Sequence, residues 1–168
     1  MKDSIIKQHN VISSEMLYSH WQGHRSLTRR VIEAFPEKDL YQFSIGGMRP
    51  FSELAMEMIK IALPGIEGIV SGKWEDMESM PTPETKKEIL ELWDKVTERI
   101  DALWPQIPDG RFEVVEAAFG LYEYPIYASL LYFIDNEIHH RGQGYVYLRA
   151  LGLTPPPFWE REEQGGLM

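Results

Sequence analysis

The stretch DNEIHHRGQGYVYLRALGLTPPPFW, residues 135–159, is the most informative part of this chain of 168 residues. The pattern around it predicts a long helix from about Pro125 to Ala150, with apolar side chains on more than one side. Gly152 and the prolines at 155–157 are expected to stop that helix. Such a helix is typical of the centre of a bundle, with one apolar arc made of Leu130, Ile134, Ile138, Tyr145 and Leu148 and another made of Phe133, Gly144 and Tyr147.

Two further helices are predicted in the first half of the chain. Apolar residues recur at alternating spacings of three and four from Ser13 to Ala34, which predicts a helix with a serine cap and an end at Pro36. The same spacing begins again at Phe51. Because Pro64 removes a hydrogen-bond donor and crowds the preceding turn, we expect the second helix to kink or stop near Ala62.

A third helix is predicted to begin with Thr82 as its N-cap and Pro83 at its first helical position, and to end at Pro105. The segment RFEVVEAAFGLY, residues 111–122, is too short and too broken by glycine for a helix, so we expect an extended or irregular crossover. The pattern therefore predicts an all-α fold, a four-helix bundle with a long crossover between helices three and four, as a single domain over residues 1–168.

Composition narrows the classes of function. The chain has no cysteine, so any metal must be held by nitrogen and oxygen ligands, and a reducing, cytoplasmic location is expected. No stretch has the length of a membrane span, so we expect no membrane partner. The net charge of −9 argues against a nucleic-acid partner. The one dense basic cluster, Arg25, Arg29 and Arg30, is interpreted as a solvated helix face.

Two histidine patterns could carry metal chemistry. Asn136 and His140 lie four residues apart, hence on one side of the predicted helix, where both can address one ion or simply pack in the core. Glu137 and His140 have the spacing of a di-iron pair, but no second such pair occurs. His20 and His24 also lie four residues apart, and this pattern is equally compatible with packing beside other side chains or with solvent exposure.

The quoted stretch resembles the C-terminal signature of the DinB/YfiT-like family, a His-x-x-x-His-Arg-Gly-Gln helix followed by Tyr-Leu-Arg, Leu-Gly and a proline pair. Trp21 and the segment IGGMRPFSELAMEM, residues 45–58, resemble the family's first helix and its loop into helix two. The resemblance covers most of the chain. It implies a four-helix bundle that binds one divalent metal, typically nickel or zinc, through three histidines.

In this chain the resemblance assigns the metal ligands to Glu57, Asn136 and His140. His140 fills the second histidine position of the motif, Asn136 stands at the first, and Glu57 stands where helix two usually supplies its histidine. A carboxylate, an amide oxygen and one imidazole form a harder donor set than three imidazoles, so an oxygen-preferring ion such as manganese or magnesium becomes relatively more acceptable than nickel or zinc.

Three outcomes are open for that site. The three residues hold a metal; or the metal is lost and they form a polar cluster; or His20 or His24 supplies a replacement nitrogen. The residues after His140 are expected to have structural roles. Arg141 is expected to pair with an acid on a neighbouring helix, and Gly142 is expected to allow a neighbouring helix to approach closely.

The resemblance implies either of two kinds of function. One is a metal-dependent enzyme, a transferase acting on a low-molecular-weight thiol or a hydrolase acting on a small-molecule substrate, in which a metal with an open position polarises a thiol or water. The alternative is a non-catalytic four-helix-bundle module that has lost its metal and binds a small molecule or a partner. A homodimer is expected by analogy with the family. Tyr145 and Tyr147 are interpreted as core or pocket wall, not as catalysts.

Overall fold

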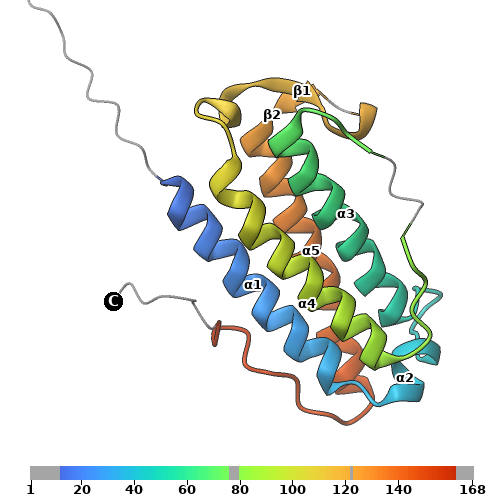
Figure 1. Cartoon of the computed structure of the whole chain (residues 1–168). Helices are drawn as coiled ribbons and strands as arrows, with labels where there is room; N and C mark the ends of the chain where they lie inside the picture. Colours follow the sequence, from blue (N-terminus) through green and yellow to red (C-terminus); the bar gives the residue numbers. More distant parts are fainter. Residues whose placement is uncertain (1–11, 76–79, 122, 162–168) are drawn as a thin grey trace, which may run out of the picture.

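The computed structural model describes residues 12–75, 80–121 and 123–161, and its architecture is a bundle of four long helices (Figure 1). A short helix, α2, lies between the first two of them at one end of the bundle. The predicted four-helix fold is confirmed. The helices are α1 (Ser14–Ala34), α2 (Glu37–Gln42), α3 (Phe51–Ser71), α4 (Lys86–Leu103) and α5 (Ile126–Ala150).

The first two long helices begin where the sequence predicts, but α3 does not end early. Ser13 caps α1, because its hydroxyl accepts a hydrogen bond of 3.2 Å from the backbone N–H of Met16. Helix α3 continues through Pro64 and ends at Gly72, whose positive φ of 72° suits a glycine cap. The predicted stop near Ala62 is therefore wrong. Ile66 and Ile69, which follow Pro64, are fully buried, and their burial offsets the lost backbone hydrogen bond.

Helix α4 begins one turn later than predicted. Thr85, not Thr82, is its N-cap: the Thr85 hydroxyl accepts from the backbone of Glu88, and the Glu88 carboxylate accepts from the backbone of Thr85. This reciprocal capping box satisfies two N–H groups that the first turn of a helix leaves free. Pro83 lies just ahead of the helix, where its carbonyl accepts from the Tyr41 hydroxyl on α2 at 3.2 Å.

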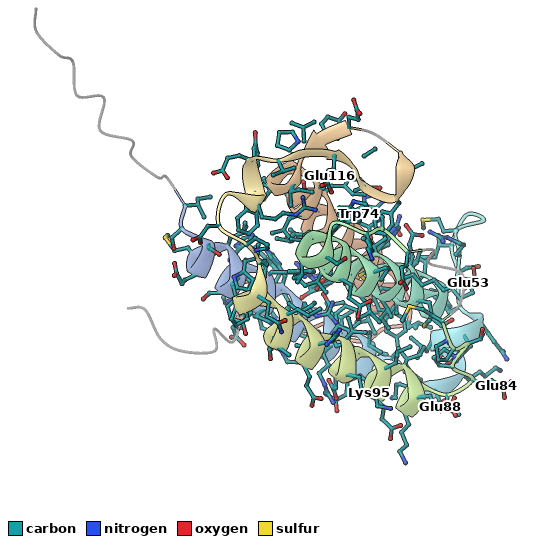
Figure 2. All side chains as sticks on the ribbon, turned by 45° about the horizontal axis from the view of Figure 1, so that its top comes forward. Glu53, Trp74, Glu84, Glu88, Lys95 and Glu116 are labelled. Atoms are coloured by element: carbon teal, nitrogen blue, oxygen red, sulfur yellow. The ribbon has the colours of Figure 1, made fainter. Side chains whose placement is uncertain are left out.

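The crossover between α4 and α5 contains a small hairpin, which the sequence analysis missed. Strands β1 (Val115–Ala117) and β2 (Glu123–Pro125) pair antiparallel, with Glu116 opposite Tyr124. Arg111 connects this hairpin to the end of α3. Its side chain is buried, donates a hydrogen bond to the carbonyl of Ile69 and forms an ion pair with Glu116. Trp74 also donates to Glu116, and Figure 2 shows the two side chains together at the hairpin end of the bundle.

The core is formed by the apolar faces of all four long helices. Helix α5 packs against α1 and α3, and α4 packs against the same two helices, so the central position predicted for α5 is wrong. One residue of its predicted arc is misplaced, because Ile138 is 38% exposed. Within the described ranges, none of the helices combines the length and the apolar character that a membrane crossing requires. The largest fully buried side chains include Trp21, Trp93, Tyr147, Phe35 and Phe51.

Two glycine–aromatic contacts set the closeness of α3 and α5. A Cβ atom on Gly144 of α5 would lie 2.5 Å from the ring of Phe51 on α3. A Cβ atom on Gly65 of α3 would lie 2.7 Å from the ring of Phe133 on α5. The helices run antiparallel, so the segments between these two contacts face each other. The predicted metal ligands lie in those segments.

Candidate metal centre

Glu57 on α3 meets Asn136 and His140 on α5. One carboxylate oxygen of Glu57, Oε1, lies 2.9 Å from Nε2 of His140 and 3.2 Å from Nδ2 of Asn136. The two α5 residues are one helical turn apart and therefore project from the same side of the helix. The structure thus brings together the three residues that the sequence analysis assigned as metal ligands.

His140 is oriented by its neighbour Gln143. Nδ1 of His140 lies 3.1 Å from Oε1 of Gln143, whose amide nitrogen faces His139 at 3.3 Å. The roles of the two ring nitrogens depend on the tautomer: in one, Nε2–H donates to Glu57; in the other, Nδ1–H donates to Gln143 and the lone pair of Nε2 is left for a metal ion. A hydrogen bond on the far nitrogen that fixes a ring in this way is typical of metal-binding histidines.

Arg49 holds the second oxygen of Glu57. Its guanidinium lies 2.5 Å from Oε2, and its own backbone carbonyl accepts from the Tyr147 hydroxyl at 2.9 Å. Burial raises the pKa of Glu57, but hydrogen bonds from Arg49, His140 and Asn136 outweigh it and lower that pKa to about 2. Glu57 is therefore a carboxylate throughout the physiological pH range, as a metal ligand must be.

Asn136 carries an unsatisfied atom at this site. Its side-chain oxygen Oδ1 is buried and has no hydrogen-bond partner, although a buried amide oxygen ordinarily has one. Because a half-turn of the amide exchanges its two ends, Oδ1 can take the position of Nδ2, 3.2 Å from the Glu57 oxygen. Two acceptors would then face each other, which is unfavourable unless a cation lies between them.

The spacing of the donor atoms fits a hard divalent ion. In an octahedral site with metal–ligand distances of about 2.1 Å, adjacent ligand atoms lie about 3.0 Å apart. The separations measured around Glu57 Oε1 are 2.9 and 3.2 Å. No group of three or more His, Asp, Glu or Cys residues suited to a metal occurs in the part of the chain that the structure describes. A metal here depends on the amide oxygen of Asn136.

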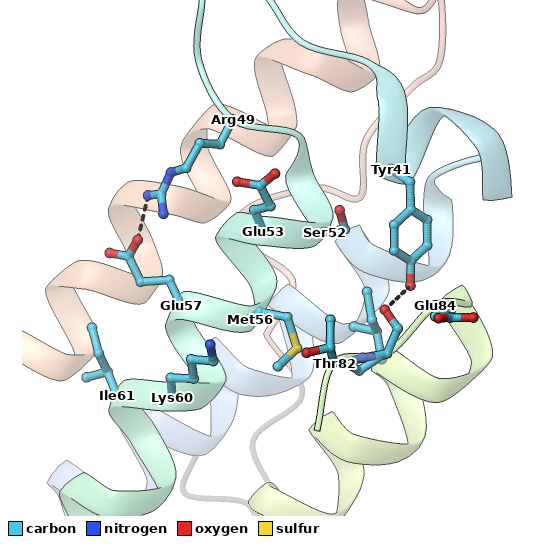
Figure 3. Close-up of a pocket in the computed structure, with 12 residues that line it drawn as sticks. Tyr41, Arg49, Ser52, Glu53, Met56, Glu57, Lys60, Ile61, Thr82 and Glu84 are labelled. Carbon is cyan, nitrogen blue, oxygen red and sulfur yellow. Dashed lines mark hydrogen bonds and ion pairs between the residues drawn. The ribbon is translucent and has the colours of Figure 1, made fainter. Parts of the chain in front are cut away.

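A groove of about 880 Å³ opens beside the candidate centre (Figure 3). Arg49 and Glu57 line one side of it, and Met56 on α3 faces Thr82 across it. Lys60, one turn after Glu57 on α3, contributes a cation that forms no ion pair with any described residue. A small molecule in this groove would therefore lie next to the carboxylate of the candidate centre and beside two cations. Its remaining lining residues are Tyr41, Ser52, Glu53, Ile61, Pro83, Glu84 and Ile89.

The other histidine patterns have different partners. His24 is buried, with Nδ1 at 2.9 Å from Arg141 and Nε2 at 2.9 Å from Arg161, while His20 is exposed. Burial, together with the charge of Arg141, lowers the pKa of His24 to about 3. Both ring nitrogens of His24 face arginines, so this residue does not serve as the replacement ligand. Glu137 does not join His140 either, because its carboxylate accepts from Thr28 at 2.7 Å.

Three interpretations of single residues need correction. Arg25 is not on a solvated face: it is fully buried, 4.0 Å from the ring of Trp93. Arg141 does contact the neighbouring helix α1, but through the carbonyl of His24 and the hydroxyl of Thr28, and its acidic neighbour lies on α5 itself. Gly142 faces open space, so the close approach to α3 is made by Gly144 instead.

Arg49 is the residue at this centre that the sequence analysis missed. It lies in the loop before α3, eight residues ahead of Glu57, and no periodic pattern connects the two positions. The pairing depends on how the loop folds back over the first turns of α3. Nothing in the sequence indicated that Arg49 pairs with Glu57. Arg49 only lies in the segment that resembles the family's loop into helix two.

Comparisons with known proteins agree with this architecture. The uncharacterized protein YjoA of Bacillus subtilis (strain 168) is 24% identical over 151 residues, which cover 88% of this chain and 97% of the relative. A crystal structure of a DinB-like protein from Bacillus cereus ATCC 10987 has a TM-score of 0.71 at 24% identity, over 86% of this chain and 97% of that one. The crystal structure of YjoA has a TM-score of 0.71 at 23% identity, over 87% and 98% of the two chains.

At these identities the solved structures show the shared fold. The sequence model of the DinB family matches residues 6–164, which is nearly the whole chain and includes every residue of the candidate centre. The chain belongs to the DinB family.

Proposed function

We propose that Glu57, Asn136 and His140 bind one divalent metal ion, and that the chain is a metal-dependent enzyme of the transferase or hydrolase type. The observation that carries the proposal is that Glu57, Asn136 and His140 converge on one point: Oε1 of Glu57 lies 2.9 Å from the His140 imidazole nitrogen and 3.2 Å from the side-chain amide of Asn136. Those three groups supply one anionic oxygen, one neutral oxygen and one nitrogen. With the Asn136 amide turned so that Oδ1 faces Glu57, all three groups can share one divalent cation.

The donor set favours a hard ion. Two oxygen donors and a single imidazole suit manganese or magnesium better than three imidazoles do, although the general order of affinities still favours zinc over manganese at most sites. Three protein ligands leave positions for water or substrate, which is the arrangement of catalytic and not structural metal sites.

A metal bound here would polarise a water molecule or a small thiol for attack on an electrophile. The protein residues have separate tasks. Arg49 keeps one oxygen of Glu57 in place, so the other oxygen remains directed at His140 and Asn136. Gln143 fixes the ring of His140. Lys60 and Arg49 line the adjoining groove, where they would attract and position an anionic part of the substrate.

The alternative, a module without metal, is favoured by a different observation. The contacts from Arg49, His140 and Asn136 already neutralise and hydrogen-bond Glu57. Such a closed polar cluster stabilises the α3–α5 contact without an ion, and the groove would then serve for binding alone.

Manganese titration separates the two functions. Binding is followed by the loss of the electron paramagnetic resonance signal of free Mn²⁺, in wild type, His140→Ala, Glu57→Gln and the control Glu53→Gln. Glu53 is an exposed carboxylate on the same groove that does not contact His140. We expect one site per chain in the wild type and the control, and a loss of at least about tenfold in affinity in the two ligand variants.

Turnover is then measured with the metal-loaded protein, using a small thiol with an alkylating dye and, separately, a 4-nitrophenyl ester. A rate that the wild type and Glu53→Gln share and His140→Ala lacks supports the enzyme. Stoichiometric metal without a rate above that of the metal-free protein supports the binding module. Absence of any saturable metal site contradicts both the metal centre and the enzyme proposal.

A further inference from the structure

Helix α5 turns an apolar side toward solvent. Its exposed side chains include Leu131 and Ile138, each 38% exposed, and Val146, which is 53% exposed. Along α5, which the structure describes in full, the only exposed Asp, Glu, Lys or Arg residues are Asp135 and Arg149. A helix at the surface of a globular protein ordinarily carries charged and polar side chains on its outer side. The outer side of α5 therefore has the composition of a surface that another element covers.

Helix α4 shows the ordinary pattern in the same bundle. Both α4 and α5 pack against α1 and α3, so the two helices have equivalent surroundings on their inner sides. The exposed residues of α4 are all charged: Lys87, Glu88, Glu91, Lys95, Glu98 and Arg99. The apolar outer side is thus a property of α5 and not of this bundle as such.

The exposed residues of α5 form a stripe with Gly142 near its middle. We define the outer stripe by residues that follow one another at spacings of three and four and therefore share one side of the helix. A Cβ atom on Gly142 would meet nothing within 4 Å, so the middle of the stripe is open. The members of the outer stripe are Leu131, Asp135, Ile138, Gly142, Val146 and Arg149.

The outer stripe is self-complementary about Gly142. Asp135 lies seven residues before this glycine and Arg149 seven residues after it, while Ile138 and Val146 lie four residues before and after it. A second copy of α5 that runs antiparallel to the first, with Gly142 facing Gly142, therefore brings the acid of each stripe to the level of the base of the other. An interface between two identical copies related by a two-fold axis requires this kind of self-complementary surface.

The two charges of the outer stripe are available for such a contact. Neither Asp135 nor Arg149 has an ion-pair partner among the described residues. Arg149 lies over the ring of Tyr145, with its guanidinium carbon 5.6 Å from the ring centroid. Both side chains are exposed, so a partner can reach them.

We propose that a second copy of this chain covers the outer stripe, with the two α5 helices antiparallel about Gly142 and Asp135 of each copy paired with Arg149 of its partner. Burial of the apolar side chains provides most of the free energy of association, since exposed ion pairs contribute little. The two ion pairs fix the direction and register of the helices. The sequence analysis expected a homodimer but assigned no surface to it. The outer stripe contains none of the proposed metal ligands, so the interface does not depend on the metal centre.

Exchange of the two charges tests the register. Sedimentation equilibrium is measured for the wild type, Asp135→Arg, Arg149→Asp, an equimolar mixture of these two variants, and the control Glu98→Arg on the outer side of α4. We expect dimers in the wild type and the control, and dissociation at least about tenfold stronger in each single variant, because like charges then meet at both ends of the contact. The mixture should dimerise again, because one chain presents two bases and the other presents two acids.

Single cysteines test the direction, because the chain has none of its own. At the usual distance between helix axes, the facing Cα atoms in Gly142→Cys lie about 4–5 Å apart, within reach of a disulfide. In Val146→Cys the two Cα atoms lie about 12 Å apart along the helices, which is too far. We therefore expect mild oxidation to link Gly142→Cys into dimers and to leave Val146→Cys and the control Glu98→Cys largely unlinked.

Four results would overturn the proposal. They are a wild type that stays monomeric up to millimolar concentration, a dimer that neither charge reversal weakens, a mixture of the two variants that does not dimerise, and a Gly142→Cys protein that links no faster than Val146→Cys.

Discussion

Two glycines of α5, Gly142 and Gly144, differ in what surrounds them, and this difference predicts opposite effects of the same substitution. A Cβ atom on Gly142 meets nothing within 4 Å. A Cβ atom on Gly144 would lie 2.5 Å from Cε2 and 2.7 Å from Cζ of Phe51. Phe51 cannot easily withdraw, because it is fully buried and stacked on Phe35 at a centroid distance of 4.7 Å.

The magnitudes follow from two opposing effects. Replacing a helical glycine by alanine stabilises the helix by about 0.5–1 kcal/mol, and this gain is common to both positions. At Gly144 the added methyl group overpacks the α3–α5 contact, which costs about 1–3 kcal/mol. Gly142→Ala should therefore raise the free energy of unfolding by somewhat under about 1 kcal/mol, whereas Gly144→Ala should lower it. The difference between the two variants isolates the steric cost.

Urea unfolding followed by circular dichroism measures both free energies. The same variants also test the centre, because the contact between Gly144 and Phe51 holds α5 at the distance where His140 meets Glu57. We expect Gly144→Ala to weaken manganese binding and Gly142→Ala to leave it unchanged. A Gly144→Ala protein as stable as Gly142→Ala would refute the steric reasoning and, with it, the account of how the helices are spaced.

Three further predictions concern single residues. Asn136→His supplies a second imidazole, so the affinity for zinc relative to manganese should rise by about tenfold or more, as measured by competition titration; an unchanged ratio would mean that residue 136 is not a ligand. The pKa of His24 is lowered to about 3, and that of an unfolded histidine is about 6.5, so the unfolded chain binds the extra proton between these values. Stability should therefore fall with decreasing pH, by at most about 1.4 kcal/mol per pH unit, and urea titrations of His24→Gln should show a shallower slope. Thr85→Ala should cost about 1 kcal/mol of stability through loss of the α4 cap, while Thr82→Ala, the matched control, should cost almost nothing; equal effects would contradict the assignment of the cap.

The long helices were predictable because their apolar periodicity is local information. A serine cap was predicted for the first helix, and Ser13 caps α1. The start of α4 was misplaced although the needed pattern is present: Thr85 and Glu88 have the spacing of a capping box, but Thr82 followed by Pro83 also looks like a helix start. The continuation of α3 through Pro64 depends on tertiary packing, which no local pattern reports.

The centre itself was predictable only in part. The three proposed ligands came from the resemblance of two segments to a family, and the structure shows that the segments meet. The ion pair between Arg49 and Glu57 joins a loop to a helix and has no signature in the sequence. The close approach to α3 was assigned to Gly142 in place of Gly144. Apolar residues lie on several sides of α5, so the sequence does not show which side faces α3.

Metal content is the most direct test of the central claim. Untagged protein, purified without a chelator and reconstituted with manganese, magnesium, zinc or nickel, is passed through a desalting column and subjected to elemental analysis. The account predicts about one divalent ion per chain in the wild type and a clear loss in His140→Ala. The same metal content in both proteins, or no stoichiometric metal in the wild type after reconstitution with any of the four ions, would contradict a centre formed by Glu57, Asn136 and His140.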